Sequence, residues 1–198
     1  MPRSVHAMVL AVIMASPGHT QTTDDPFAES IGARQAALEV RITECATIPD
    51  SDGSAPRMML LVDEPGTGRL FVNDMRGPLY SVSYDGQTVT PYLNLNDPTW
   101  NVPVEFSRNE QGFQSFAFHP QFNDSGAPGF GKFYTLTDTA DTGPPADFTS
   151  GGDLNSHDTV LLEWTAEDPG ALTYDGGPPR ELIRYEQPVL SLIHISEP

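Results

Sequence analysis

Short apolar segments separated by tight turns are the feature that most limits how this chain can fold. Glycine and proline are frequent, at 17 and 19 of 198 residues, which favours many short strands over long helices. The turns read EPGTG, RGP and Asp85-Gly86, and the last of these is a strong hairpin signal. A first antiparallel meander of four strands is therefore predicted from the segments 58–62, 69–74, 79–84 and 87–95.

The residue patterns in this meander also predict what each strand faces. Segment 58–62 (MMLLV) is apolar throughout, which is typical of a buried strand. In the third strand the residue types alternate, which predicts one apolar and one polar face. The expected apolar face carries Tyr80, Val82 and Tyr84, and the expected polar face carries Ser81 and Ser83.

The pattern starts again after a polar insertion at 96–110. Segments 112–120, 132–139, 159–166 and 180–188 predict four further strands, joined by long loops rich in Gly, Pro and Asp. Two four-stranded meanders in tandem indicate an all-β chain made of β-propeller blades. A two-sheet sandwich is the structural alternative. The one segment with helical periodicity is 27–39, and it runs into an alternating segment at 38–45.

Charge and targeting signals restrict the classes of function. The formal net charge of −17 disfavours binding to a phosphate backbone, so no nucleic-acid partner is expected. Cys45 is the single cysteine, which excludes an internal disulfide. No apolar run reaches the roughly 18 residues of a membrane span. Arg3 followed by the apolar run 7–15 predicts a signal peptide and flexible N-terminus over 1–23, and export to the periplasm or the medium; a ragged reading-frame start is the alternative.

Few residues have the pattern of a self-contained catalytic or metal site. The loop from Asp50 resembles a calcium loop only at its start, because Leu61 stands where an EF-hand has its bidentate Glu. GTGRL at 66–70 is predicted to be a turn rather than a dinucleotide loop, since no helix follows it. His119 is predicted to cap a strand. His157-Asp158 allows a charge-relay pair or, the favoured alternative, a turn.

Three segments resemble one enzyme family. EPGTGRLFVNDMRGPLYSV (64–82), EQGFQSFAFHPQF with GFGKFYTLTDT (110–139), and SHDTVLLEW with RELIRYEQP (156–188) are similar to the blades of soluble glucose/sorbosone dehydrogenases. FAFHP with its downstream Gly and Tyr is the most specific part. The usual Leu-Leu-Gly is replaced by Phe113, Gln114 and Ser115, which indicates a divergent subgroup. The resemblance covers roughly residues 38–188.

The resemblance implies a six-bladed propeller enzyme of bacterial origin, of which this chain is an N-terminal part with about two blades. Such enzymes oxidise a sugar hydroxyl by hydride transfer to pyrroloquinoline quinone (PQQ), with calcium orienting the quinone and a histidine as general base. Glu110 matches a position that lines the cofactor pocket, and His119 matches a structural histidine. No catalytic residue or metal ligand is assigned within the chain, because the matching histidine, the basic cofactor ligands and the calcium ligands are expected beyond it.

The last nine residues, LSLIHISEP at 190–198, have a separate explanation. They match at every position the in-frame translation of a transposon-type sequencing adapter, so we expect a non-native tail after a partial propeller at 24–189. His194 is then given no catalytic role. We expect the fragment to be inactive and its parent to be a PQQ-dependent sugar dehydrogenase. The alternatives are a propeller lactonase or esterase, or a propeller that binds carbohydrate without catalysis.

Overall fold

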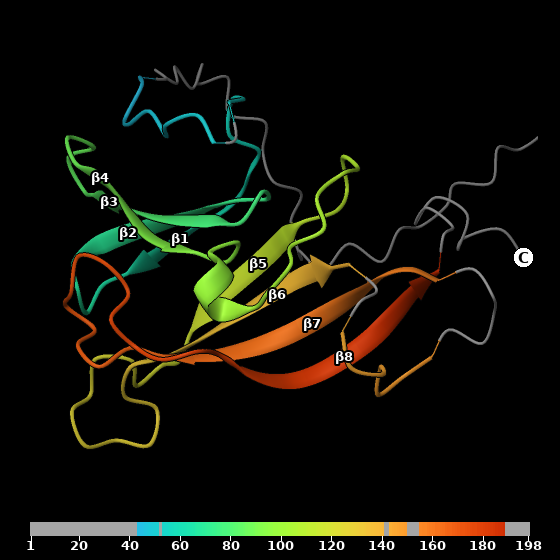
Figure 1. Cartoon of the computed structure of the whole chain (residues 1–198). Helices are drawn as coiled ribbons and strands as arrows, with labels where there is room; N and C mark the ends of the chain where they lie inside the picture. Colours follow the sequence, from blue (N-terminus) through green and yellow to red (C-terminus); the bar gives the residue numbers. More distant parts are fainter. Residues whose placement is uncertain (1–42, 52, 141–142, 150–154, 189–198) are drawn as a thin grey trace, which may run out of the picture. The chain divides into compact units, whose positions relative to one another are not determined.

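A computed structural model of the chain describes residues 43–51, 53–140, 143–149 and 155–188. All of them belong to the second of two compact units, 43–198. The described part contains eight strands and one short 3-10 helix, Pro98–Trp100 (Figure 1). The strands are β1 (Met58–Glu64), β2 (Arg69–Asp74), β3 (Pro78–Ser83), β4 (Val89–Asn94), β5 (Phe113–Phe118), β6 (Lys132–Thr139), β7 (Asn155–Thr165) and β8 (Arg180–Pro188).

The strands form two four-stranded antiparallel sheets, in the orders β1-β2-β3-β4 and β5-β6-β7-β8. The predicted all-β class and the two tandem meanders are therefore confirmed. Each strand pairs with its neighbour in sequence, and the two sheets approach each other through their first strands, β1 and β5. This is the arrangement expected of two consecutive propeller blades. The main difference from the sequence prediction is β7, which begins at Asn155 rather than at residue 159.

An aromatic core fills the space between the two sheets. Phe71 from β2 lies 5.2 Å from Tyr92 of β4 and 4.7 Å from Phe118 of β5, measured between ring centroids. Phe133 and Trp164, from neighbouring strands of the second sheet, are fully buried and stack at 6.1 Å. The Trp164 indole N–H donates to the Thr135 hydroxyl at 2.9 Å, so the buried ring leaves no unpaired donor. This core fixes the second sheet against the first.

The first sheet also has a smaller core on its other face, which changes one prediction. Tyr80 and Val82 pack there with Ile48, as the alternation predicted. Ser81, expected on a polar face, is only 3% exposed because the aromatic core covers that side too. Tyr84 lies in the turn after β3 and is exposed, so it does not share the buried face. Alternation correctly divided the two faces of the strand, but it could not predict that both are covered.

The prediction that segment 58–62 is a buried strand is wrong for this part of the chain. It forms β1, but Met58, Met59 and Leu61 are each more than half exposed, at 60%, 57% and 60%. β1 is the end strand of its sheet, and among the described strands it pairs only with β2. An unbroken apolar run predicts a strand by its composition, whereas burial depends on what packs over it.

Several predictions fall outside the described residues. These are the signal peptide and N-terminal segment (1–23), the helix at 27–39, most of the segment 38–45, and the tail at 190–198. Within the described residues, Cys45 is free and exposed, and no helix is long and apolar enough to cross a membrane. Residues 66–68 of GTGRL lie in the turn between β1 and β2, as predicted, and Arg69 and Leu70 begin β2.

Candidate functional site

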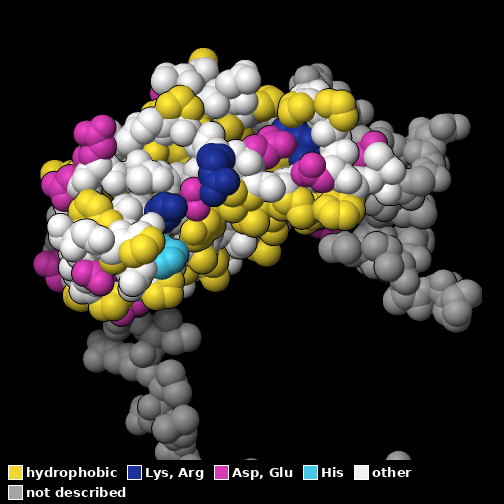
Figure 2. All heavy atoms as spheres, turned by 90° about the horizontal axis from the view of Figure 1, so that it is seen from below, with side chains coloured by type: hydrophobic (Ala, Val, Ile, Leu, Met, Phe, Trp, Pro, Cys, Tyr) yellow, Lys and Arg dark blue, Asp and Glu magenta, His cyan; other side chains and the backbone are white. Residues whose placement is uncertain are grey.

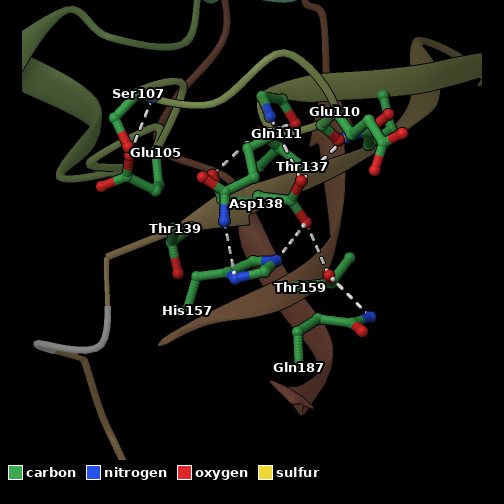
Figure 3. Close-up of polar contacts among 12 residues, drawn as sticks. Glu105, Ser107, Glu110, Gln111, Thr137, Asp138, Thr139, His157, Thr159 and Gln187 are labelled. Atoms are coloured by element: carbon green, nitrogen blue, oxygen red, sulfur yellow. Dashed lines mark hydrogen bonds and ion pairs between the residues drawn. The ribbon is translucent and has the colours of Figure 1, made fainter. Parts of the chain in front are cut away.

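Polar side chains gather at one end of the second sheet. In an antiparallel meander the start of β5, the end of β6, the start of β7 and the end of β8 all meet at the same end. Figure 3 shows side chains from these strand ends pointing toward one another. We call this group the Asp138 cluster; its members are Gln111, Gln114, Asp138, His157, Thr159 and Gln187.

Asp138 is the centre of the cluster. It is 4% exposed, and each of its carboxylate oxygens accepts hydrogen bonds. Oδ2 accepts from the Gly112 backbone N–H at 3.1 Å and from Gln114 Nε2 at 2.8 Å, while Oδ1 accepts from the Thr159 hydroxyl at 2.6 Å. A buried carboxylate needs such donors to remain in place, and here they come from β5, β7 and the residue before β5. The cluster therefore ties together strands that are far apart in sequence.

His157 lies between Gln111 and Asp138 (Figure 3). Its Nδ1 is 2.9 Å from Gln111 Nε2, and its Nε2 is 3.8 Å from Asp138 Oδ1. The side chain is 12% exposed. Since Gln111 Nε2 can only donate, the geometry assigns Nδ1 as the acceptor and places the ring proton on Nε2, facing the carboxylate. Both ring nitrogens are thus directed into the cluster.

Gln111 is the most enclosed amide of the group. It is 6% exposed, and its Oε1 is buried without a hydrogen-bond partner among the described residues. A buried carbonyl oxygen left without a donor costs about 1–3 kcal/mol relative to a satisfied one. The amide of Gln111 is therefore held through its nitrogen, while its oxygen is a buried acceptor without a donor among the described residues.

A second carboxylate, Glu105, lies in the loop that leads to the cluster. The Ser107 hydroxyl and the Ser107 backbone N–H donate to it and lower the pKa of Glu105, and the nearby His157 lowers it further. The backbone N–H of Ser107 lies 2.8 Å from Glu105 Oε1. Glu105 therefore stays ionised below the usual carboxyl range, and this end of the sheet carries negative charge.

A buried ion-pair network lies on the opposite face of the same strands. Arg184 is 6% exposed and donates from its NH1 to Asp158 Oδ2 at 3.0 Å and to the Thr139 hydroxyl at 3.1 Å. Its other nitrogens bind Glu181 at 2.9 and 2.7 Å. The hydrogen bonds that Arg184 donates to Glu181, and then to Asp158, raise the pKa of Arg184 against the effect of burial. This network holds β7 and β8 together and leaves Arg184 little capacity for a ligand.

The His157-Asp158 pair is therefore neither of the things predicted from the sequence. Both residues lie inside β7, not in a turn. As neighbours in a strand they point to opposite faces, so a charge relay between them is excluded by geometry. His157 faces Asp138, whereas Asp158 binds Arg184. The sequence pattern did not predict that His157 and Asp158 belong to a strand, because the apolar segment begins only at residue 159 whereas β7 begins at Asn155.

The other two predicted positions have different outcomes. His119 is structural, as predicted: its N–H donates to the Lys132 carbonyl at 3.0 Å, and its Nδ1 accepts from the Gln121 N–H at 3.0 Å. Glu110 is exposed, and its backbone carbonyl accepts from Gln114 Nε2 at 2.6 Å. It lies directly before Gln111 at the edge of the Asp138 cluster, and its role in cofactor binding stays a prediction.

Sequence reasoning missed most of the Asp138 cluster. Gln111, Asp138 and Thr159 were not singled out, although each stands at or beside the end of a predicted strand. The predicted strand order could have identified these residues. Once four strands are assigned as a meander, polar residues before the first, at the end of the second and at the start of the third must share one end of the sheet.

The cluster does not fit a PQQ molecule or a calcium ion by itself. PQQ carries three carboxylates and needs cationic partners. Three arginines lie near this end. Arg184 is already paired, Arg57 donates to the Phe106 and Arg108 carbonyls at 3.0 Å each, and Arg108 is exposed beside the ionised Glu105. Among the described residues, no group of three His, Cys, Asp or Glu side chains could hold a metal ion. Neutral hydrogen-bonding groups suit the site better.

Comparisons with known proteins give a limited result. Neither a protein-family model nor a curated protein sequence matches the chain. A solved structure described as a crystal structure of glucose dehydrogenase is similar to 65% of the chain at 15% identity and a TM-score of 0.44. Another glucose dehydrogenase structure is similar to 69% of the chain at 17% identity and a TM-score of 0.46. The chain spans 30% and 34% of these two structures, and likeness at this level says nothing of substrate or cofactor.

Proposed function

We propose that this chain is part of a quinone-dependent sugar dehydrogenase, and that the Asp138 cluster contributes to recognition of the sugar. The observation that carries the proposal is the position of the family-like segment 110–118. It runs through Gln111 and Gln114 into β5, and so delivers the start of the most specific motif to the polar end of the second sheet. The proposal thus joins the motif resemblance to a buried group of side chains suited to hydroxyl binding.

The chemistry of the cluster supports a neutral polyhydroxy ligand. Amide, hydroxyl and imidazole groups provide both donors and acceptors, and the Glu105 and Glu110 carboxylates can accept from hydroxyl groups. An anionic sugar would meet the Glu105 and Glu110 carboxylates here as well as the Arg57 and Arg108 guanidinium groups, so the charge of this end gives it no advantage over a neutral sugar. Binding and orientation of the substrate are the steps that these residues can perform.

The remaining parts of the proposal concern the complete enzyme. They comprise PQQ and calcium held by groups outside the described residues, a histidine general base, a pocket lined in part by Glu110, and export to the periplasm or the medium. The proposal also includes an adapter-derived origin for residues 190–198. PQQ would supply hydride acceptance when bound, and no role in that step is assigned to the described side chains.

The test is to recover the natural gene beyond codon 189 and to assay its product. We expect native coding sequence with a histidine in a glycine-rich segment shortly after Gln187. The purified product should oxidise an aldose with an artificial electron acceptor only after it is loaded with PQQ and calcium. Genomic DNA that encodes LSLIHISEP in place, or a PQQ-loaded product that oxidises no sugar, would contradict the proposal.

A second candidate is a propeller that binds carbohydrate without catalysis. It is favoured by the Asp138 cluster itself, where both nitrogens of His157 are directed to protein partners, so the ring is not placed to take a proton from a substrate. The same assay separates the candidates: saturable sugar binding by the complete protein without PQQ-dependent turnover would support this one.

A further inference from the structure

The starting observation is the unpartnered oxygen of Gln111. Its Oε1 is one of four buried side-chain atoms without a hydrogen-bond partner among the described residues, the others belonging to Arg57, Tyr92 and Trp100. Gln111 differs from those three because it lies beside the family-like motif and within a polar cluster. A buried acceptor at such a position indicates a donor that the protein chain does not supply.

The orientation of the Gln111 amide is fixed by a chain of contacts. Gln187 Nε2 donates to the Thr159 hydroxyl at 3.2 Å, and that hydroxyl donates to Asp138 at 2.6 Å. Asp138 faces the Nε2 of His157, and the opposite ring nitrogen accepts from Gln111 at 2.9 Å. In this orientation the amide nitrogen of Gln111 donates to the ring, and Oε1 has no hydrogen-bond partner among the described residues.

The surroundings indicate what kind of donor Oε1 would accept. The residues immediately before Gln111, 107–110, are exposed, so the adjoining surface is open to solvent. The charged groups there are the carboxylates of Glu105 and Glu110, which accept hydrogen bonds, and the guanidinium groups of Arg57 and Arg108. A sugar hydroxyl suits this site, because it can donate its one proton to Oε1 without introducing a charge.

We propose that the Oε1 of Gln111 is the acceptor for one specific hydroxyl group of the sugar, and that His157 is a positioning residue that holds the Gln111 amide in place through Asp138. This inference rests on the proposed function, since it names the residue that would select the sugar. It predicts a preference for one hydroxyl, because a buried acceptor left unpaired penalises analogues that lack its donor.

The test is a thermodynamic cycle on the full chain, with D-glucose and its 2-, 3- and 6-deoxy analogues as probes in calorimetric titrations. The wild type should bind one deoxy analogue about tenfold more weakly than glucose, because it lacks the hydrogen-bonding hydroxyl. Gln111→Met, which keeps the length of the side chain but not the amide, should bind that analogue and glucose equally. Equal losses for the analogue in wild type and variant would overturn the proposal.

Two variants at His157 test whether this residue orients the Gln111 amide or only supports the fold. His157→Asn keeps an acceptor near the place of Nδ1 and should retain discrimination between glucose and the analogue. His157→Phe removes that acceptor and should lose discrimination, and circular dichroism would show whether both variants stay folded. Loss of discrimination in His157→Asn as well, with the fold intact, would count against the positioning role.

A spectroscopic measurement tests the same geometry without any sugar. Nitrogen-15 spectra of labelled wild type should show that the neutral form of the His157 ring carries its proton on Nε2. A proton on Nδ1 of the neutral wild-type ring would overturn the proposal. Failure of the complete enzyme to oxidise sugars would contradict the proposed function but leave this cycle and this tautomer unchanged, so the two can fail separately.

Discussion

Two buried aspartates occupy corresponding places in the two sheets. Asp74 is the last residue of β2, and Asp138 is the last but one of β6, the second strand of each sheet. Asp74 is fully buried and accepts from the backbone N–H groups of Arg57 and Arg76 at 3.1 and 3.0 Å, and from the Ser51 hydroxyl. Asp138 instead binds mainly side chains and faces His157.

The two aspartates differ in what they bind: Asp74 is held mainly by backbone donors, and we propose that Asp138 serves ligand recognition instead. Backbone donors at Asp74 close the turn after β2 and fix the chain before β1. Side-chain donors at Asp138 build an adaptable group at the end of the second sheet, near the family-like motif. The same repeated fold element therefore supports stability in the first sheet and, in our account, recognition in the second.

The largest loss of stability is expected from a substitution that disrupts the aromatic core between the two sheets. Trp164→Ala removes a fully buried ring that stacks on Phe133 and lies 5.8 Å from Trp100. It should lower the free energy of unfolding by about 3–5 kcal/mol, measured by urea denaturation. Leu172→Ala, at a side chain that is 67% exposed, is the control and should change stability by less than about 0.5 kcal/mol. Similar values for both would contradict the core described.

A smaller loss is expected where the sheets meet before β5. Gly112 has a φ of +139°, and an added Cβ would lie 2.0 Å from the Met75 carbonyl oxygen. Gly112→Ala should therefore cost about 2–3 kcal/mol of stability, and it should also weaken sugar binding by displacing Gln111. Gly177→Ala meets nothing within 4 Å and should be nearly neutral in both measurements. A Gly112→Ala protein as stable as the wild type would show that the close contact between Gly112 and the Met75 carbonyl is not required for stability.

The two aspartates can be compared directly by paired substitutions. Asp74→Asn and Asp138→Asn should each cost about 1–3 kcal/mol, since each replaces one buried acceptor oxygen by a donor. Only Asp138→Asn should weaken binding of D-glucose, because only Asp138 contacts the groups that hold Gln111. Measurement of denaturation and of glucose affinity on both proteins would refute the comparison if Asp74→Asn lost affinity by the same factor.

The fold was largely predictable, because strand-length segments and turn residues carry local information. Seven of the eight strands fall on their predicted segments, and β8 matches 180–188 in full. Burial was less predictable: the apolar run of β1 is exposed, and Ser81 is buried. Both outcomes depend on which faces another layer covers, and no local pattern records that.

The candidate site was harder to predict because its members are joined through the fold. Gln111 and His157 are 46 residues apart in sequence, yet a hydrogen bond connects them. Their residue types alone do not distinguish them from surface amides and histidines. The motif resemblance located the segment around Glu110, whereas only the sheet register brought Asp138 and Thr159 to it.

A small pH dependence of stability is expected from Glu163, which lies outside the Asp138 cluster. Glu163 binds Arg180 at 3.0 Å and lies 3.6 Å from Lys132. Basic and acidic side chains also stand among hydrophobic ones on the face of the molecule shown in Figure 2. Burial alone would raise the pKa of Glu163, but the hydrogen bond from Arg180 and the charge of Lys132 lower it overall. Its contribution to stability is therefore present above the unfolded carboxyl pKa and is lost as pH falls through the lower folded value.

Glu163→Gln should accordingly reduce stability at neutral pH by less than about 1 kcal/mol, since Arg180 is exposed. The difference from wild type should disappear in acid, and glucose affinity should not change. Urea denaturation of both proteins between neutral and acidic pH is the measurement. A difference that grows as the pH falls would contradict the assigned ion pairs.

The central claim is that the polar end of the second sheet, and not the matching end of the first, receives the ligand. Titration of the nitrogen-15-labelled chain with D-glucose tests it most directly. We predict saturable amide shift changes grouped at Gln111, Gly112, Asp138 and Thr159, with Asp74 and Arg76 unchanged. Changes centred on Asp74, or no saturable change at any position, would contradict the account.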